Sequence, residues 1–268
     1  MRKINKIKLF VNDNDKSRIV AKDLELELIK YGFKVVTKGK YDLAISVGGD
    51  GSFLRMIKET AFNDEVYYIG VNSGTLGFLQ EIDIKNCSDF VKRLNINDFR
   101  EEHISIQKTK IITEDEVYIF SSLNEITIRA KDFNVLKMDV FIDNSLLEHF
   151  TGDGILASTA TGSTAYNMSF GGSIVYNSLN TLSIVPIAPI SNKVYHTLMV
   201  PIIVPNNNIV SFVPSKENQS LEFKIDGENK CINKVLRIDT LVSDNYIKCI
   251  RMNDFHFIKV VNDKIIGN

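Results

Sequence analysis

The sequence predicts an α/β N-terminal domain with a Rossmann-like parallel sheet, followed by a mostly β, sandwich-like C-terminal domain. The first observation is the order strand, helix, strand, strand, helix over residues 6–57, which is typical of α/β folds. The second is a change after about residue 97, where short apolar runs alternate with polar residues and turn signals. We therefore expect an α/β domain over residues 1–100, a β domain over 101–250, and a segment 251–268 that packs back on the first domain.

The elements of the first domain follow from apolar periodicity. In residues 16–31, Val20, Leu24 and Leu28 recur at helical spacing and Gly32 follows, which predicts an amphipathic helix that ends there. The polar residues 12–15 are expected to supply its N-cap. The predicted strands are Lys6–Val11, Phe33–Thr37, Leu43–Val47 and Val66–Val71, and two further helices are predicted from Ser52 and over Asp83–Leu94.

The second domain is predicted from short strands and turn residues. Asp143-Asn144 and Asp226-Gly227 have the chemistry of hairpin turns, because these residues tolerate positive φ. The predicted strands are Val117–Phe120, Ile126–Arg129, Val135–Ile142, Leu182–Val185, Ile202–Val204, Ile209–Val213 and Leu221–Ile225.

Composition limits the class of protein. The 268 residues are 44% hydrophobic and 24% charged with a net charge of −1, so we expect a globular protein with no nucleic-acid or membrane partner. The three cysteines are far apart and form no CxxC pair, which argues against a disulfide framework or a zinc site and fits a reducing cytosol. The first ten residues lack the apolar core of a secretion signal, and no apolar run is long enough for a membrane span. We therefore expect a cytoplasmic protein.

The main chemical signal of the first domain is Gly48-Gly49-Asp50-Gly51, between the strand predicted over 43–47 and the helix predicted with Ser52 as its N-cap. Ligands of open α/β sheets bind at this edge, and amide groups at a helix start attract phosphate. A carboxylate beside a phosphate site is repulsive unless it binds a metal or handles a proton, which is the functional interpretation of Asp50. On this motif alone, a strand-to-helix turn with a local aspartate cap explains the residues equally well.

Three further motifs point to a ligand. Residues 72–79 form a second glycine loop. The pair Asn124-Glu125 can bind neighbouring hydroxyls and an amide-like base edge, although a strand-end turn explains this pair more simply. In residues 151–172, glycines and small hydroxylic side chains crowd around an aspartate, and Tyr166 can stack on a base or ribose. This density favours a ligand loop over a turn that is merely rich in serine and threonine.

Together these motifs resemble the NAD kinase (ATP-NAD kinase) family, and the resemblance covers about Lys6 to Val261. Lipid kinases of the same superfamily share GGDG but not the TGSTAY block at 161–166. The chain departs from the family at Ala160, where a proline is usual, and at Thr151, where many members have a basic residue. Arg55 or Lys193 is a candidate replacement for that cation.

The resemblance implies a reaction. The protein would transfer the γ-phosphoryl group of ATP to the 2′-hydroxyl of the adenosine ribose of NAD, giving NADP. Mg²⁺ would be bound through the phosphates, and the chain would form a homodimer or homotetramer. The alternatives are a diacylglycerol or sphingoid kinase of the same superfamily and a non-catalytic dinucleotide-binding sensor. The net charge and the TGSTAY block argue against the lipid kinase, and the intact GGDG motif argues against the sensor.

The resemblance also implies site residues. Asp50 would be the catalytic base, Asn124 would address adenine, and Glu125 would bind ribose hydroxyls, with Asp226 nearby. The amides that would hold the ATP phosphates are those of Gly48, Gly49 and Gly51. The residues that the resemblance places against NAD are Gly51, Arg55, Phe78, Asn124, Glu125, Asp153, Thr161, Thr164, Ala165, Tyr166, Asn167, Ser169 and Ala188.

Overall fold

The computed structural model describes residues 3–74, 77–216 and 219–267, and the chain divides into two compact units. Unit 1 contains Met1–Ile104 and Tyr246–Asn268, and unit 2 contains Ser105–Asn245. The predicted fold class is confirmed, since unit 1 is a parallel α/β structure and unit 2 is largely β. The domain boundaries expected near residues 100 and 250, and the packing of segment 251–268 on the first domain, stay predictions. No helix in the described part of the chain has the length and apolar content needed to cross a bilayer.

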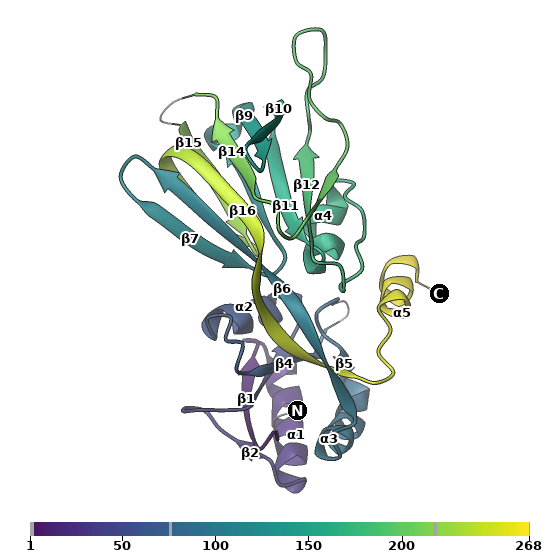
Figure 1. Ribbon diagram of the computed structural model, residues 1–268. Helices are drawn as coiled ribbons and strands as arrows, with labels where there is room; N and C mark the ends of the chain where they lie inside the picture. The colour runs from purple at the N-terminus through teal and green to yellow at the C-terminus, as the bar shows by residue number, and fades with distance from the viewer. Residues whose placement is uncertain (1–2, 75–76, 217–218, 268) are drawn as a thin grey trace. The chain divides into compact units, whose positions relative to one another are not determined.

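Unit 1 is built on a parallel sheet with the strand order β2-β1-β3-β4-β16, of which β1, β2, β4 and β16 are labelled in Figure 1. Its central strand β3 pairs in parallel with β1 and β4, so that Ile45 lies between Leu9 and Ile69. All six residues of β3 are buried, which is typical of a strand covered on both faces. The strands of this unit are β1 (Lys6–Val11), β2 (Lys34–Val35), β3 (Leu43–Gly48), β4 (Tyr67–Asn72), β5 (Ile82–Asp83) and the last residues of β16 (Glu228–Met252).

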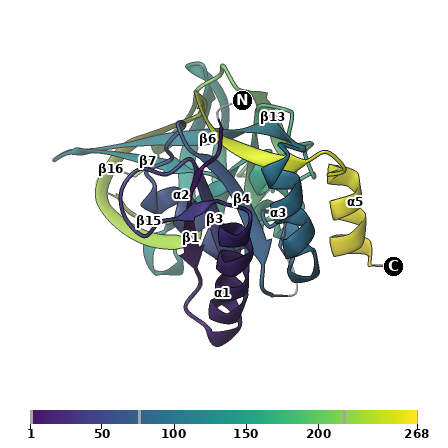
Figure 2. The same ribbon diagram turned by 90° about the horizontal axis from the view of Figure 1, so that it is seen from below.

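Helices cover this sheet. Helices α1 and α3 lie side by side and share one core with the strands (Figure 2). As predicted, α1 has a polar N-cap, because the Asn14 side chain accepts a hydrogen bond from the Ser17 amide at 2.8 Å. Helix α2 buries Phe53 and Met56 and contacts β3 and β1. The helices of this unit are α1 (Asp15–Lys30), α2 (Asp50–Glu59), α3 (Cys87–Asn95) and α5 (Phe257–Val261), with shorter turns η1 (Ile84–Asn86) and η4 (Asn262–Ile266).

Three predicted boundaries in unit 1 are wrong. Ser52 is not an N-cap, because α2 begins at Asp50 and the extended residue Gly49 precedes it. The helix predicted from Asp83 begins at Cys87, because Asp83 ends β5 and caps the short turn η1. The strand predicted over 33–37 pairs at only two residues, since it lies at the edge of the sheet.

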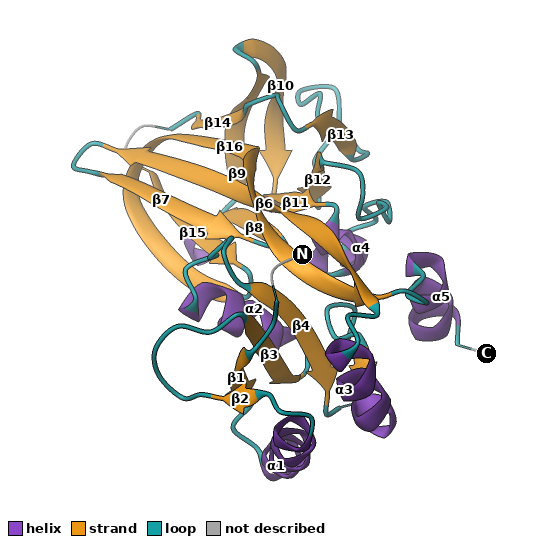
Figure 3. Ribbon diagram, turned by 60° about the horizontal axis from the view of Figure 1, so that its bottom comes forward, coloured by secondary structure: helices purple, strands orange, loops and turns teal. Residues whose placement is uncertain are grey.

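Unit 2 consists mainly of antiparallel strands (Figure 3). One run of strands has the order β13-β12-β11-β8-β15-β16, while β14 links β16 to β9 and β10, and β7 pairs with β6. Alternate residues of these strands, such as Ile126, Ile128 and Phe223, point into one apolar core. The strands are β6 (Phe99–Thr113), β7 (Val117–Ser122), β8 (Glu125–Ala130), β9 (Leu136–Ile142), β10 (Ser145–Gly152), β11 (Gly154–Thr159), β12 (Thr181–Ile187), β13 (Ile202–Pro205), β14 (Val210–Pro214), β15 (Gln219–Ile225) and β16.

The turns of unit 2 confirm one prediction and correct another. Asp143 and Asn144 have φ of 49° and 66°, and Asp226 and Gly227 have φ of 44° and 88°, as tight hairpin turns require. The glycine-rich residues 151–159, in contrast, are not a loop: all of them except Asp153 belong to β10 and β11. The reason is that β11 is buried on both faces: Ile155 and Ala157 enter the main core and Leu156 enters a smaller apolar cluster, so the strand lacks the alternation of apolar and polar residues that reveals a half-exposed strand. After β11 the chain forms two short helices, η3 (Thr161–Thr164) and α4 (Tyr166–Ser169).

Candidate active site

Asp50 lies at the carboxyl edge of the parallel sheet of unit 1, as the first residue of α2. Its Oδ2 accepts a hydrogen bond from the Phe78 amide at 2.8 Å, and its Oδ1 accepts one from the Leu79 amide at 2.9 Å. The two bonds fix the orientation of the carboxylate. Because a carboxylate offers about four acceptor positions, each oxygen can still accept a proton from a ligand.

The three glycines around Asp50 differ in whether packing requires them. A Cβ on Gly48 would lie 2.2 Å from the Ser52 Oγ, so packing of the strand against the helix requires glycine there. A Cβ on Gly49 or Gly51 would meet no atom within 4 Å, and neither residue has positive φ. The fold therefore tolerates a side chain at 49 and 51, and its absence leaves the backbone amides of the first turn of α2 open to a ligand.

A second segment of unit 1, residues 77–80, supports this cluster. The Gln80 Nε2 donates a hydrogen bond to the Gly49 carbonyl at 2.7 Å and so holds the residue before Asp50. A Cβ on Gly77 would lie 2.6 Å from the Asp50 Oδ1, which explains why this position is a glycine. Thr75 and Leu76, which belong to the predicted loop 72–79, lie outside the described residues. The supporting role of Gln80 was missed, because no motif contains it.

Two basic side chains of unit 1, Lys264 and Arg55, differ in their distance from the Asp50 cluster, and of these two described residues only Lys264 interacts with Asp50. The Lys264 Nζ lies 5.8 Å from the centre of the Phe78 ring. Burial lowers the pKa of Lys264, and the negative charge of Asp50 opposes that change. The predicted residue Arg55 is exposed, donates to the Asn12 side chain at 3.4 Å, and lies 3.8 Å from the Glu59 carboxylate. Lys264 belongs to none of the motifs and lies far from Asp50 in the chain, so local patterns could not predict its position near this carboxylate.

In unit 2 the Asn124-Glu125 pair is held by Asp226. The Asp226 carboxylate accepts backbone hydrogen bonds from Leu123 at 2.6 Å, from Asn124 at 2.8 Å and from Glu125 at 3.2 Å. Burial raises the pKa of Asp226 to about 6, and these three hydrogen bonds limit the rise. The hairpin residue Asp226 therefore positions the start of β8. Asp226 was expected to lie near Glu125, and these hydrogen bonds place it there.

Glu125 is itself a buried carboxyl group, 6% exposed. Burial and then the charge of Asp226 raise the pKa of Glu125 to about 8, while Lys224 and the Tyr166 amide oppose the rise. Within the described part of the chain, the Glu125 Oε2 and the Asn124 Oδ1 have no hydrogen-bond partner. Because buried polar atoms are normally paired, these two mark a position where a polar ligand would be stabilised.

The residues after β11 pack against this pair. A Cβ on Gly162 would lie 2.2 Å from the Asn124 carbonyl oxygen. The Tyr166 ring is half-buried and packs edge-to-face on Phe170, with ring centres 4.7 Å apart. Asn167, predicted to contact NAD, is fully buried and its amide donates to the carbonyls of residues 163 and 173. Its contact with a dinucleotide stays a prediction.

The predicted residues of unit 2 fall into two groups along β11. Asn124, Glu125 and Tyr166 lie near its end, where Ser158 pairs with Glu125. Asp153 and Ala188 lie at its start, both exposed, and the Asp153 amide donates to the Ile187 carbonyl at 3.0 Å. The two groups are separated by about 17 Å of strand. Of the other predicted residues and departures, Thr151, Ala160, Thr161 and Thr164 are buried, Ala165 is half-buried, and Ser169 and Lys193 are exposed.

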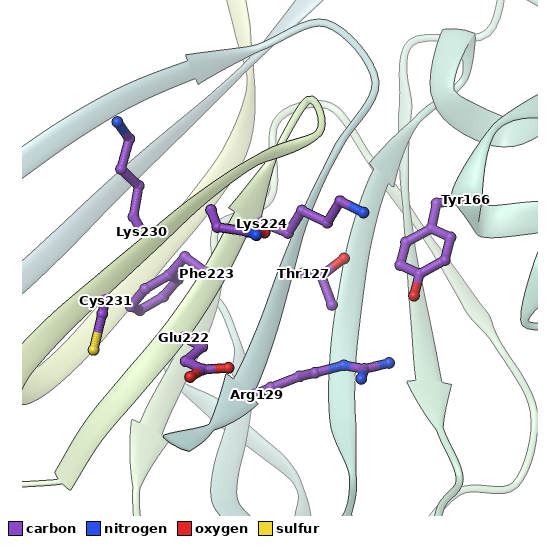
Figure 4. A pocket seen from close by; sticks show the side chains of 9 residues that line it. Thr127, Arg129, Tyr166, Glu222, Phe223, Lys224, Lys230 and Cys231 are labelled. Carbon is purple, nitrogen blue, oxygen red and sulfur yellow. The ribbon is translucent and has the colours of Figure 1, made fainter. Parts of the chain in front are cut away.

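A pocket of about 490 Å³ opens beside Tyr166 in unit 2 (Figure 4). It is lined by residues of β8, β15 and β16. Among the described residues, no group of three or more histidine, cysteine, aspartate or glutamate side chains is placed to hold a metal ion. The lining residues are Thr127, Arg129, Tyr166, Glu222, Phe223, Lys224, Asn229, Lys230 and Cys231.

Comparison with known proteins identifies the family. Residues 7–99 match the ATP-NAD kinase N-terminal domain, and residues 123–252 match the ATP-NAD kinase C-terminal domain. The chain belongs to the ATP-NAD kinase family. It is 35% identical to the NAD kinase of Finegoldia magna, with 97% of each chain covered, and 33% identical to that of Latilactobacillus sakei, with 98% of each covered.

Solved structures of this family share the fold. Yeast NADH kinase complexed with NADH gives a TM-score of 0.87 at 20% identity, over 100% of this chain and 89% of that chain. An NAD kinase from Archaeoglobus fulgidus in complex with ATP gives 0.74 at 19% identity, over 98% and 99% of the two chains.

Proposed function

We propose that this member of the ATP-NAD kinase family transfers the γ-phosphoryl group of ATP to the 2′-hydroxyl of the adenosine ribose of NAD, giving NADP and ADP. The structural observation that carries the proposal is the Asp50 carboxylate. It is held by the amides of Phe78 and Leu79, and it lies beside two glycines whose missing side chains leave open space. Family membership indicates the reaction. The geometry offers a base and a phosphate-binding backbone at the carboxyl edge of the sheet, where ligands of such sheets bind.

In this proposal Asp50 accepts the proton of the 2′-hydroxyl as its oxygen attacks the γ-phosphorus. The bond from that phosphorus to the β–γ bridging oxygen breaks, and ADP leaves. Positioning matters most in phosphoryl transfer, and the two backbone hydrogen bonds to Asp50 provide it. The amides of Gly48, Gly49 and Gly51 bind phosphate oxygens in this proposal. Those at the start of α2 lack acceptors within the helix, whereas Gly48 is the last residue of β3.

A divalent metal fits this site only through the nucleotide. No cluster of three ligands occurs among the described residues, and Mg²⁺ is usually held by one or two carboxylates together with substrate phosphates. When bound, Mg²⁺ would neutralise charge that develops on the phosphates.

Unit 2 supplies dinucleotide recognition in this proposal. The buried Asn124 Oδ1 and Glu125 Oε2, which lack partners among the described residues, accept hydrogen bonds from the adenine amino group and a ribose hydroxyl. Tyr166 offers a half-buried aromatic face beside them. The proposal also retains the other residues predicted to contact NAD, among them Arg55, Phe78, Asp153 and Ala188.

The quaternary state and location are proposed as well. We infer a homodimer or homotetramer, which the exposed apolar residues Val194, Met199 and Val200 of unit 2 support. Light scattering on purified protein gives the mass. The three free cysteines support a reducing, cytosolic environment.

The test is direct. Purified protein is incubated with ATP, Mg²⁺ and NAD, and NADP is measured, with Asp50→Asn as the matched inactive control. A parallel reaction contains diacylglycerol in place of NAD. We expect NADP only in the first reaction and none when Mg²⁺ is chelated. Phosphorylated diacylglycerol, or no product while NAD still binds, would replace the proposal with the lipid-kinase or sensor alternative.

A further inference from the structure

The pocket beside Tyr166 contains polar groups that the motif residues do not explain. Thr127 lines it, is only 2% exposed, and its Oγ1 has no hydrogen-bond partner among the described residues. Leaving a buried hydroxyl unpaired is costly unless a ligand satisfies it. Thr127 therefore indicates that the pocket receives a polar molecule.

Two cations converge on the same point. Figure 4 shows the Arg129 guanidinium and the Lys224 ammonium pointing toward Tyr166, with the Thr127 hydroxyl between them. The Lys224 Nζ lies 5.2 Å from the centre of the Tyr166 ring. In the described part of the chain neither Arg129 nor Lys224 forms an ion pair, whereas Lys230 points away and lies 3.6 Å from the Glu228 carboxylate.

The chemistry of these groups selects an anion. A guanidinium and an ammonium group are hydrogen-bond donors without acceptor capacity, and the threonine hydroxyl can donate as well. A phosphate group accepts from all three, and an arginine guanidinium matches it with two parallel hydrogen bonds. Glu222 is the one acidic side chain of the lining, so the lining stays net positive.

The position along β8 connects this pocket to the proposed ribose contact. Glu125, Thr127 and Arg129 are alternate residues of one strand and share a face. Each pair is separated by about 7 Å of strand. A nucleotide whose ribose contacts Glu125 can therefore place a phosphate group over Thr127. We propose that Thr127, Arg129 and Lys224 form a phosphate subsite for a pyridine dinucleotide, and this inference rests on the proposed function.

The phosphate can come from the pyrophosphate that both dinucleotides carry or from the 2′-phosphate of NADP. Calorimetric titrations of NAD, NADP, inorganic pyrophosphate and adenosine into each variant separate these sources. We expect Arg129→Gln and Lys224→Gln to weaken NAD and pyrophosphate binding by about ten-fold to a hundred-fold and to leave adenosine unchanged. A loss for NADP alone would retain the subsite and assign it to the 2′-phosphate.

Matched variants separate a lost contact from a lost fold. Thr127→Val should weaken NAD, and Thr127→Ser should restore its affinity, because serine keeps the hydroxyl. Lys110→Gln is the control variant, because it removes an exposed positive charge of unit 2 that does not line the pocket. This variant should bind all four ligands with wild-type affinity. The melting temperature of each variant is first compared with that of the wild type. Wild-type affinity for both dinucleotides in Arg129→Gln and Lys224→Gln would overturn the subsite.

Failure of the proposed function gives a different result. If the wild type forms no NADP but Arg129→Gln still loses affinity for the dinucleotides, the reaction is wrong and the subsite stands. If the wild type forms NADP and the variants bind as it does, the subsite is wrong and the reaction stands.

Discussion

The glycine-rich segments of the two units look alike in sequence but differ in the fold. In unit 1, a Cβ on Gly49 or Gly51 would meet no atom within 4 Å. In unit 2, a Cβ on Gly154 would lie 2.7 Å from the Ile128 carbonyl oxygen, and one on Gly162 would lie 2.2 Å from that of Asn124. The first pair leaves space beside Asp50, while the second pair lets backbones touch. Small residues in a motif thus mark ligand access in one unit and close packing in the other.

The most severe test of unit 1 is Asp50→Asn. We expect turnover to fall by about 10²–10⁴-fold, because an amide cannot accept the hydroxyl proton. A small loss of stability should accompany it, since the asparagine NH₂ would face one of the two amides that Asp50 binds. Steady-state kinetics and NAD affinity separate the two effects. Near-normal kcat would remove Asp50 from the chemistry.

In unit 2 the matching change is Gly162→Ala. The added methyl group would collide with the Asn124 carbonyl, and overpacking of this kind costs about 1–3 kcal/mol. For a chain of this size the melting temperature should fall by roughly 2–12 °C. Scanning calorimetry measures the shift. An unchanged melting temperature would mean that the contact relaxes freely and that the difference between the units is smaller than described.

Glu125→Gln tests recognition rather than packing. If Glu125 binds a ribose hydroxyl, NAD affinity should fall about two-fold to ten-fold near neutral pH, because the raised pKa keeps this carboxyl protonated and a hydrogen bond between neutral groups is worth ~0.5–1.5 kcal/mol. ATP affinity should not change. Titrations of NAD and ATP into the folded variant are compared with the same titrations into Tyr166→Ala. Equal losses for both ligands, or none with lower melting, would return Glu125 to a structural role.

Gly51→Ala is the counterpart of Gly162→Ala in unit 1. Its methyl group would meet open space, and alanine favours a helix over glycine by about 1 kcal/mol. We therefore expect unchanged or slightly higher melting together with at least roughly ten-fold slower turnover, because the methyl occupies the approach of the phosphates. A variant with full activity would show that the space beside Gly51 is not used by a ligand.

The last prediction concerns the pH dependence of stability. Burial raises the pKa of Glu125 from 4.5 to about 8, so the folded state holds its proton more tightly than the unfolded chain does. Its contribution to the free energy of unfolding is complete below about pH 4.5 and is lost as pH rises through 8. The wild type should therefore lose more stability than Glu125→Gln between pH 5 and 9, which melting curves of the two proteins at both pH values measure. Parallel melting curves would contradict this.

Much of the fold could be predicted because the relevant signals are local. The spacing of Val20, Leu24 and Leu28 gave α1, and the apolar run at 43–47 gave β3, since both periods are set by neighbouring residues. The start of α2 was misplaced for a non-local reason. The carboxylate of Asp50 binds amides that lie 28 and 29 residues further along the chain, and no local rule reports that.

Local patterns were enough to predict the fold class, the order of the elements in unit 1, the hairpin turns at 143–144 and 226–227, and the motifs that resemble ATP-NAD kinases. Tertiary contacts were needed to show which glycines face open space, and that burial beside Asp226 raises the pKa of Glu125. It also brought Lys264 near Phe78, and Arg129 and Lys224 around Thr127. The physical reason is that periodicity and turn chemistry act over a few residues. Burial, crowding and the convergence of charges depend on strands and segments that pair across the whole chain.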